Sequence, residues 1–547
     1  MRQLFRFPGG IHPEEHKAES SARPIHAPFI PNRLIIPLRQ HIGQPAKPIV
    51  TIGEKVLKGQ MIGQADGYVS AAVHASSSGV VTEIGLHLVP HPSGLSDLCI
   101  TIETDGQDQW TDLQPLDWQN MDPAAVRGYV RDLGIAGLGG AVFPSSIKLD
   151  SRNQPIHTLI LNGGECEPWI TCDDRLMRER AEEILQGARI MQHLLQAQTV
   201  IAGIEDNKPE AIAAMQAASE KLGMAIEIVA MPTRYPGGGG KQITQTLTGL
   251  ETPSGKLSTD IGVQVFNIGT AYALARAILH GEPLISRIVT VTGHVLGAQN
   301  YETLIGTPLG ELVTHAGDRE GTTGIIMGGP MMGFDVHPDT PVVKATNCVL
   351  AKSVELFPPK PRELPCIRCT QCAFACPASL QPQELYWFAR AKNFGKAQEY
   401  NLFDCIECGC CSYVCPSHIP LVDYYRFAKS EIWAREKEKH AADIARERHE
   451  FRLFRQEREK KEKAERLAAK AQTKKSEAPT LAPDEQDAKK KLIEEALARA
   501  QARKAAVAPK NTDNLTPEQQ AEIAEIEARR AKIREMAKKT IEPEKHL

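Results

Sequence analysis

The sequence lacks the long apolar segments of membrane proteins. Nowhere in its 547 residues do about 18 apolar residues follow one another without charges, so no transmembrane helix is predicted. The start, from Met1 to Gly10, lacks the apolar stretch of a secretory signal peptide. An excess of basic charge is also lacking, because 64 Lys and Arg stand against 67 Asp and Glu. We therefore expect no membrane span and no nucleic acid as a partner.

Apolar and aromatic residues become scarce in residues 431–547, where Lys, Arg, Glu and Ala dominate. Such a composition cannot supply a packed core, so we predict charged helices or disorder. Pairs of opposite charge four residues apart, such as Glu457 with Lys461, would support helices. A solubilising tail and a docking arm both remain open interpretations of this segment.

Cysteine is present but unevenly spread, since eight of the 13 fall into two runs with the spacing C-x2-C-x2-C-x3-C-P. In bacterial ferredoxins with this spacing, three thiolates of one run and the last Cys of the other bind one [4Fe–4S] cluster. We predict one cluster on Cys366, Cys369, Cys372 and Cys415, and a second on Cys405, Cys408, Cys411 and Cys376. Cys410 falls outside the spacing and is predicted to be a bystander.

Other uses of these cysteines fit the pattern poorly. A four-cysteine zinc site usually presents two C-x2-C pairs separated by a longer loop. Disulfides would need an oxidising compartment, and haem attachment would need a C-x-x-C-H run, which is absent. Metal-bound thiols of this kind fit a reducing compartment. Two adjacent clusters would form a path for single electrons.

The first third of the chain is predicted to be mostly β. Residues 1–28 form an N-terminal segment that Pro and Gly interrupt too often for long elements. In residues 29–110, short apolar runs such as Arg33–Ile36 and Cys99–Ile102 are separated by glycines. This region resembles the barrel-sandwich hybrid of biotinyl and lipoyl carrier domains. The carriers modify a Lys in a hairpin that here reads Gly67 to Ser70 without Lys, so a structural module is predicted.

Residues 120–280 alternate between helix and strand, which predicts a parallel α/β domain. Helices are predicted from Pro123 towards Gly134, over 174–196 and over 211–222, and strands over 158–161, 199–202 and 225–230. Two glycine-rich loops lie in this domain, Gly134 to Pro144 and Tyr235 to Gln242. Glycines allow the main chain to approach a phosphate closely. Neither loop matches G-x-G-x-x-G or the Walker A pattern, and taken alone both could be turns.

Between the loops, the segment Asn162-Gly-Gly-Glu-Cys-Glu-Pro168 follows a predicted strand. Together, these segments resemble the flavin subunit of respiratory complex I and related hydrogenases. The resemblance implies a non-covalent FMN and NADH as substrate. The FMN ligands implied are Gly137, Gly139, Gly140, Lys148, Asn162, Glu165, Glu167, Tyr235, Gly238, Asn267 and Thr270. Phe143 would stack on the nicotinamide nucleotide, and Glu167 would lie near its ribose. The sequence departs from the family at Gly164, where Asp is usual, and at Gly239 and Gly240, where Glu is usual.

The last two folded regions complete the predicted architecture, a multidomain α/β and α+β protein. Residues 284–345 return to β and resemble the soluble-ligand-binding β-grasp that follows the flavin domain in the same family. Met331 and Met332 are predicted to lie in its core. Residues 360–430 hold both Cys runs, with a helix predicted over 383–400, so a helical ferredoxin domain is expected. Tyr386, Trp387 and Phe388 are expected to keep water from the clusters.

The order of all these parts resembles the family of C subunits of Rnf (Rsx) ion-translocating ferredoxin:NAD+ oxidoreductases. The resemblance implies a peripheral oxidoreductase and translocase subunit on the cytoplasmic face of the bacterial inner membrane, with no catalytic side chain of its own. Implied partners are integral-membrane and iron–sulfur subunits and, indirectly, ferredoxin or flavodoxin. Two other interpretations remain open: an iron–sulfur relay or scaffold without flavin, and a zinc-bound nucleic-acid module, for which Arg362 and Arg368 supply too little basic charge.

Overall fold

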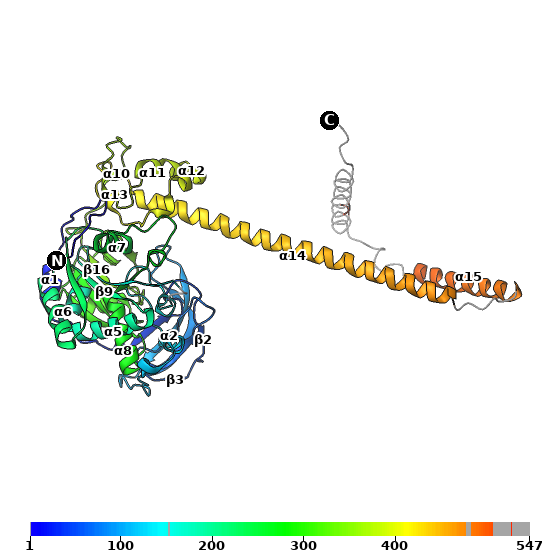
Figure 1. The fold of residues 1–547 in the computed structure, drawn as a ribbon, viewed down its shortest axis with the longest axis horizontal. Helices are drawn as coiled ribbons and strands as arrows, with labels where there is room; N and C mark the ends of the chain where they lie inside the picture. The colour runs from blue at the N-terminus through cyan, green and yellow to red at the C-terminus, as the bar shows by residue number, and fades with distance from the viewer. Residues whose placement is uncertain (1, 151–153, 477–482, 507–523, 525–526, 528–547) are drawn as a thin grey trace. The chain divides into compact units, whose positions relative to one another are not determined.

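The computed structural model describes residues 2–150, 154–476, 483–506, 524 and 527. The chain divides into two compact units, residues 1–438 and 439–547. Among these described residues, the packed cores lie in the first unit and the second unit contributes helices (Figure 1). Within the described residues, every helix is too short or too polar to cross a bilayer.

The N-terminal β domain consists of two small sheets that share one core. One sheet has the order β1-β7-β6-β3 and the other β2-β4-β5, all antiparallel. The strands are β1 (Arg33–Pro37), β2 (Lys47–Pro48), β3 (Lys55–Val56), β4 (Met61–Gln64), β5 (Val73–His74), β6 (Gly79–Leu88) and β7 (Ser96–Thr104). Leu34, Ile62 and Ile100 from both sheets meet in the core. The predicted strands at 33–36 and 99–102 are thus confirmed as β1 and β7. Before them, residues 2–32 contain a single short helix, α1 (Ala18–Ser21).

A four-stranded parallel sheet forms the centre of the first unit, as predicted. Its order is β10-β9-β8-β11, and its strands are β8 (Thr158–Gly163), β9 (Thr199–Glu205), β10 (Ile226–Met231) and β11 (Val263–Asn267). Side chains of one strand alternate between its faces. Leu159 and Leu161 pack with helices α5 (Ala181–Leu195) and α8 (Ile268–His280), whereas Ile160 packs with α7 (Gly240–Thr248). Helices therefore cover both faces (Figure 1).

The remaining helices of this domain follow local sequence signals, with one exception. Asp122 caps α2 (Pro123–Asp132) by accepting a hydrogen bond from the amide of Ala124. Gly223 ends α6 (Pro209–Leu222) in a left-handed conformation. The predicted helix over 174–196 is wrong as one element, because Arg180 leaves the helical conformation and separates α4 (Cys172–Glu179) from α5. Short helices α3 (Ser145–Lys148), η1 (Trp118–Asn120) and η2 (Ser258–Ile261) complete the domain.

The second β region is a mixed five-stranded sheet of order β13-β12-β16-β14-β15. Its elements are β12 (Ser286–Gly293), β13 (Gln299–Leu304), α9 (Leu309–His315), β14 (Gly324–Met327), β15 (Phe334–Val336) and β16 (Cys348–Lys352). The β-grasp assignment remains a prediction. Met331 and Met332 sit in the turn between β14 and β15. The prediction that they lie in the core is wrong for Met332, which is 45% exposed, whereas Met331 is half-buried and packs against an apolar cluster with Tyr235 and Cys408.

The cysteine-rich domain is built from short helices and loops. Its elements are α10 (Gln371–Ala375), α11 (Pro382–Arg390), α12 (Phe394–Glu399), η3 (Leu402–Asp404), α13 (Cys410–Tyr413) and the start of α14 (Leu421–Ser476). The single helix predicted over 383–400 is wrong, since Lys392 adopts φ +55° and Asn393 caps a new helix. Tyr386 is buried, but Trp387 is 39% exposed, so only part of the predicted aromatic shield is buried.

The second unit, as far as it is described, consists of the rest of α14 and of α15 (Pro483–Ala506). Ion pairs four residues apart accompany α14, such as Arg455 with Glu459 at 3.6 Å and Arg458 with Glu462 at 3.5 Å. Phe451 and Phe454 are exposed. The prediction of charged helices therefore agrees with the described part, and the remainder of the predicted tail lies outside the described residues.

Candidate functional site

The carboxyl ends of β8 and β11 form the edge on which the glycine-rich loops converge. Asn162 and Asn267 are paired partners at the ends of these strands. The loop at 137–140 is held to the start of α8, because the amide of Leu138 donates to Thr270 Oγ1 at 2.9 Å. Such an edge is where ligands bind in open parallel sheets. Six predicted flavin residues meet here: Gly137, Gly139, Asn162, Gly238, Asn267 and Thr270.

Asn162 joins two loops at this edge. Its Nδ2 donates to the carbonyl of Gly238 at 2.8 Å, and its Oδ1 accepts from the amide of Gly164 at 2.9 Å. A Cβ on Gly164 would lie 2.9 Å from Gly238 Cα, and one on Gly238 would lie 2.0 Å from Gly164 O. The Asp that the resemblance expects at position 164 therefore has no room here.

The space beside the loops suits a ligand that needs close approach to the main chain. A Cβ built on Gly140 or Gly240 would meet no atom within 4 Å. Beside β11, Lys148 Nζ donates to the carbonyl of Val265 at 2.5 Å and lies 4.3 Å from the centre of the Phe266 ring. Burial lowers the pKa of Lys148 to about 8. No acidic side chain pairs with this amine among the described residues, so the donor set fits an anionic group such as a phosphate.

The two predicted glutamates have structural uses that the sequence did not reveal. Glu165 accepts from the amides of Asp173 at 2.8 Å and Asp174 at 3.3 Å, so it caps the start of α4. Burial raises the pKa of Glu165 to about 7. Glu167 Oε1 accepts from the amides of Met331 at 2.8 Å and Met332 at 3.1 Å. Their assignment to FMN or NADH remains a prediction.

The two aromatic residues of the predicted flavin and nucleotide site, Phe143 and Tyr235, differ in how deeply they are buried. Phe143 is half-buried, and its carbonyl accepts from the amide of Gly137 at 2.8 Å. Tyr235 is only 2% exposed, and its hydroxyl donates to the carbonyl of Cys408 at 2.5 Å. Tyr235 thus connects the second glycine-rich loop to the cysteine-rich domain, a role that its position in the sequence did not indicate.

Four of the predicted cluster ligands surround one apolar cavity, and we call them the inner set: Cys376, Cys405, Cys408 and Cys411. The cavity is small, with a volume of about 20 Å³, and is also lined by Leu380, Val422 and Tyr425. Burial, followed by repulsion from other thiolates of the set, raises the pKa of Cys405 to about 11. The last Cys of the first run therefore lies with three Cys of the second, as the spacing predicted. Four thiols around one apolar site are the kind of ligands that a [4Fe–4S] cluster takes.

The other four cysteines form what we call the outer set: Cys366, Cys369, Cys372 and Cys415. Burial raises the pKa of Cys372, and the nearby charges of Cys369 and Cys415 raise it further. Cys369 is exposed, and the other three are half-buried. A hydrogen bond from the amide of Leu364 to the carbonyl of Ser417 holds the first run against the end of the second. The structure thus brings together the predicted members of this set.

Two further thiols lie near the inner set, the buried Cys410 and the half-buried Cys166. Cys410 lines the same cavity, and its thiol hydrogen-bonds Cys408. Cys166 packs beside Tyr235 and Cys408, and its sulfur accepts from the amide of Gly238 at 3.3 Å. Location alone does not separate Cys410 from the four predicted ligands, whereas the ferredoxin spacing does.

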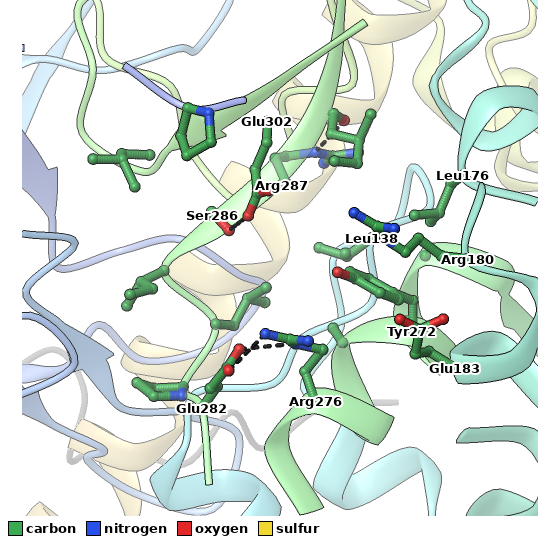
Figure 2. Close-up of a pocket in the computed structure, with 18 of the residues that line it drawn as sticks. Leu138, Leu176, Arg180, Glu183, Tyr272, Arg276, Glu282, Ser286, Arg287 and Glu302 are labelled. Atoms are coloured by element: carbon green, nitrogen blue, oxygen red, sulfur yellow. Dashed lines mark hydrogen bonds and ion pairs between the residues drawn. The ribbon is translucent and has the colours of Figure 1, made fainter. Parts of the chain in front are cut away.

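A separate pocket of about 500 Å³ lies where three domains meet (Figure 2). None of the twelve predicted flavin residues lines it. Figure 2 shows Arg276 paired with Glu282, through bonds of 2.8 and 2.6 Å, and Ser286 bonded to Glu302 at 2.8 Å. Arg287, also in its wall, is buried and donates to the carbonyl of Lys344. Two pairs of its polar groups therefore satisfy each other.

Three family models match separate parts of the chain. They are described as RnfC barrel sandwich hybrid domain, over residues 5–107, Nuo51 FMN-binding domain, over residues 130–276, and 4Fe-4S dicluster domain, over residues 365–419. The matches confirm the predicted barrel-sandwich, FMN-type and iron–sulfur domains. The β-grasp assignment, the cluster count and the individual ligands remain predictions.

Curated relatives share most of the chain. A Vibrio cholerae (strain O395) protein, named as the C subunit of an ion-translocating oxidoreductase complex, is 46% identical over 517 residues, which cover 94% of this chain and 66% of that protein. A Serratia proteamaculans (strain 568) protein of the same name is 44% identical, covering 97% of this chain and 74% of that protein. The chain therefore spans slightly less than two thirds of the Vibrio relative. A solved NAD+-reducing [NiFe]-hydrogenase matches 59% of this chain and 63% of its own, with 18% identity and a TM-score of 0.43.

Proposed function

The chain belongs to the family of C subunits of ion-translocating oxidoreductase complexes, and on that premise we propose that it exchanges electrons between NADH and single-electron carriers of a membrane complex. The exchange would be coupled, in other subunits, to ferredoxin oxidoreduction and cation translocation. The observation that carries the proposal is the direct contact between the flavin-type loop and the inner set, through Tyr235 and Cys408. A flavin and a cluster need such proximity to exchange electrons.

We propose that FMN binds along the edge formed by β8, β11 and the two glycine-rich loops. Main-chain amides near Gly137, Gly139 and Gly140 would approach the cofactor, and Lys148 would supply positive charge. Bound FMN would supply the change between two-electron and one-electron chemistry, and [4Fe–4S] clusters would carry single electrons. The protein's own part is to orient these groups and exclude water from between them.

The two cysteine sets would hold two clusters with different access to solvent. The inner set is mostly buried and touches the flavin domain, whereas the outer set includes the exposed Cys369. Beside the outer set, Ile367 is 67% exposed and Phe374 is 80% exposed. Arg368 forms no ion pair within the described part of the chain. We infer that a one-electron partner with an apolar and acidic face meets the chain here, at the end of the path remote from the flavin loops.

Neighbouring cysteines offer a matched test of the ligand assignment. Cys411→Ser removes a proposed ligand of the inner set, whereas Cys410→Ser changes the adjacent buried thiol. Anaerobically purified wild-type protein should contain about eight irons, and the Cys410 variant should keep them. The Cys411 variant should lose about half of the iron, because three thiolates hold a four-iron cluster poorly. Iron analysis and electron paramagnetic resonance measure both.

The same preparations test the competing functions. FMN together with about eight irons supports the proposed electron exchange. Eight irons without flavin in freshly purified protein would instead support a relay or scaffold, and zinc in place of iron would contradict both. Equal iron loss in the Cys410 and Cys411 variants would contradict the assignment of the inner set.

A further inference from the structure

The N-terminal segment passes directly between the flavin domain and the inner set. We call residues 7–11 (Phe-Pro-Gly-Gly-Ile) the strap. On one side, the amide of Gly10 donates to the carbonyl of Ala375 at 3.0 Å. Gly9 has φ +62°, and a Cβ there would lie only 2.4 Å from the carbonyl carbon and oxygen of Cys376. Main chain therefore packs on main chain at a proposed cluster ligand.

On its other side, the strap pairs with the second glycine-rich loop. Ile11 and Tyr235 exchange two main-chain hydrogen bonds, of 2.8 and 3.0 Å. The guanidinium of Arg234 lies 5.1 Å from the centre of the Phe7 ring and donates to the carbonyl of Phe7 at 3.4 Å. A Cβ on Gly10 would lie 2.7 Å from Arg234 Nε. One short segment thus binds the loop of one domain and the ligand run of another.

The junction between the second glycine-rich loop and the inner set is buried among apolar side chains. Ile11 and Tyr235 are buried in one apolar cluster with Ala375, Cys408 and Cys410. Burial in this cluster holds the inner set against the loop, together with an ion pair of 3.5 Å between Lys241 of the loop and Asp404 beside Cys405. The geometry of the junction therefore depends largely on close packing. A displacement at Gly9 would therefore be transmitted to Cys376 and to the inner set.

We propose that the strap is a positioning element that sets the separation between the inner set and the flavin-type loops. The proposal rests on the proposed function, because it matters only if electrons cross this junction. Electron transfer between two centres slows steeply as they move apart. The strap fits into the junction because Gly9 and Gly10 allow its main chain to approach both sides closely. It would fix the separation without taking part in electron transfer itself.

Two glycines with the same backbone conformation provide the test. In Gly9→Ala, the new methyl collides with Cys376 and should move the ligand run. In Gly94→Ala, the backbone strain is matched, since Gly94 has φ +65°, but a Cβ there would meet no atom within 4 Å. Both variants should keep flavin and iron. After rapid anaerobic mixing with NADH, the Gly9 variant should show cluster reduction slowed severalfold relative to flavin reduction, because electron transfer slows steeply with the distance between the two centres.

Hydrogen exchange supplies a second measurement that needs no electron transfer. In the wild-type protein, the amides of Gly10, Ile11 and Tyr235 should exchange slowly, and in Gly9→Ala they should exchange faster. An unchanged ratio of cluster to flavin reduction in Gly9→Ala, or fast exchange of these amides in the wild type, would overturn the proposal. If the wild type binds no flavin, the proposed function fails, while the exchange data still decide whether the strap holds the junction. Should Gly9→Ala lose iron, the wild-type exchange rates decide the question.

Discussion

The buried side chain of Lys344 joins three domains, and its burial makes the free energy of unfolding depend on pH. The residue is 1% exposed, and its Nζ donates to the carbonyls of Gly134 at 2.6 Å and Ala72 at 3.2 Å. These carbonyls belong to the flavin-type domain and the N-terminal β domain. Burial lowers the pKa of Lys344 from 10.5 to about 7. The amine is therefore held at the junction by hydrogen bonds that do not require its charge.

The pKa shift of Lys344 predicts how stability changes with pH. Between pH 7 and 10.5 the unfolded chain holds a proton on this amine that the folded chain has lost, so stability rises with pH in this window. Relative to Lys344→Met, the wild type should gain about 2 kcal/mol between pH 7 and pH 9. Urea unfolding at both pH values, followed by tryptophan fluorescence, measures the difference. The exposed Lys55→Met is the control, and a parallel pH dependence of wild type and Lys344→Met would refute the prediction.

At the scale of elements, the close approach of two loops decides whether the flavin edge is intact. Gly164→Ala would place a methyl 2.9 Å from Gly238 Cα and 3.1 Å from Asn162 Oδ1. Overpacking of this kind costs about 1–3 kcal/mol, so the loops should separate and FMN content should fall. Flavin released from the purified variant, measured by fluorescence, reports the loss.

The control for this prediction is another glycine of the same domain. Gly128 lies inside α2, and a Cβ there would meet no atom within 4 Å. Gly128→Ala should keep wild-type flavin content and gain about 0.5–1 kcal/mol of stability, because alanine favours the helix. Wild-type flavin content in Gly164→Ala would show that the edge tolerates a side chain and that FMN binds elsewhere.

Most elements were predictable because their signals are local. Asp122 before Pro123 and Gly223 after α6 marked helix ends, and the apolar run at Thr158 marked β8. The break at Arg180 carried no such signal, since Arg180 is neither Gly nor Pro, whereas the break at Lys392 is followed by Asn393, a helix-capping residue that the helical spacing had masked. Met332 was misassigned because its apolar side chain suggested burial, whereas the structure exposes the side chain and uses its amide to bind Glu167.

For the whole molecule, the sequence predicted the members of each site better than the connections between sites. Ferredoxin spacing alone placed Cys376 with the second run, and the shared cavity agrees. The contacts of Gly9 with Cys376 and of Tyr235 with Cys408 join residues more than 170 positions apart. No local pattern announces such contacts, because they depend on how finished domains pack. The relation of flavin loop, strap and inner set therefore required the structure.

An anaerobic titration of the purified protein with NADH tests the central claim most directly. The claim is that a flavin at the glycine-rich edge and clusters on the inner and outer sets form one continuous path. NADH should bleach the flavin absorbance and, in the same protein, the broad iron–sulfur absorbance in the visible region. Eight irons and bound FMN, with clusters that stay oxidised after NADH has reduced the flavin, would contradict the account.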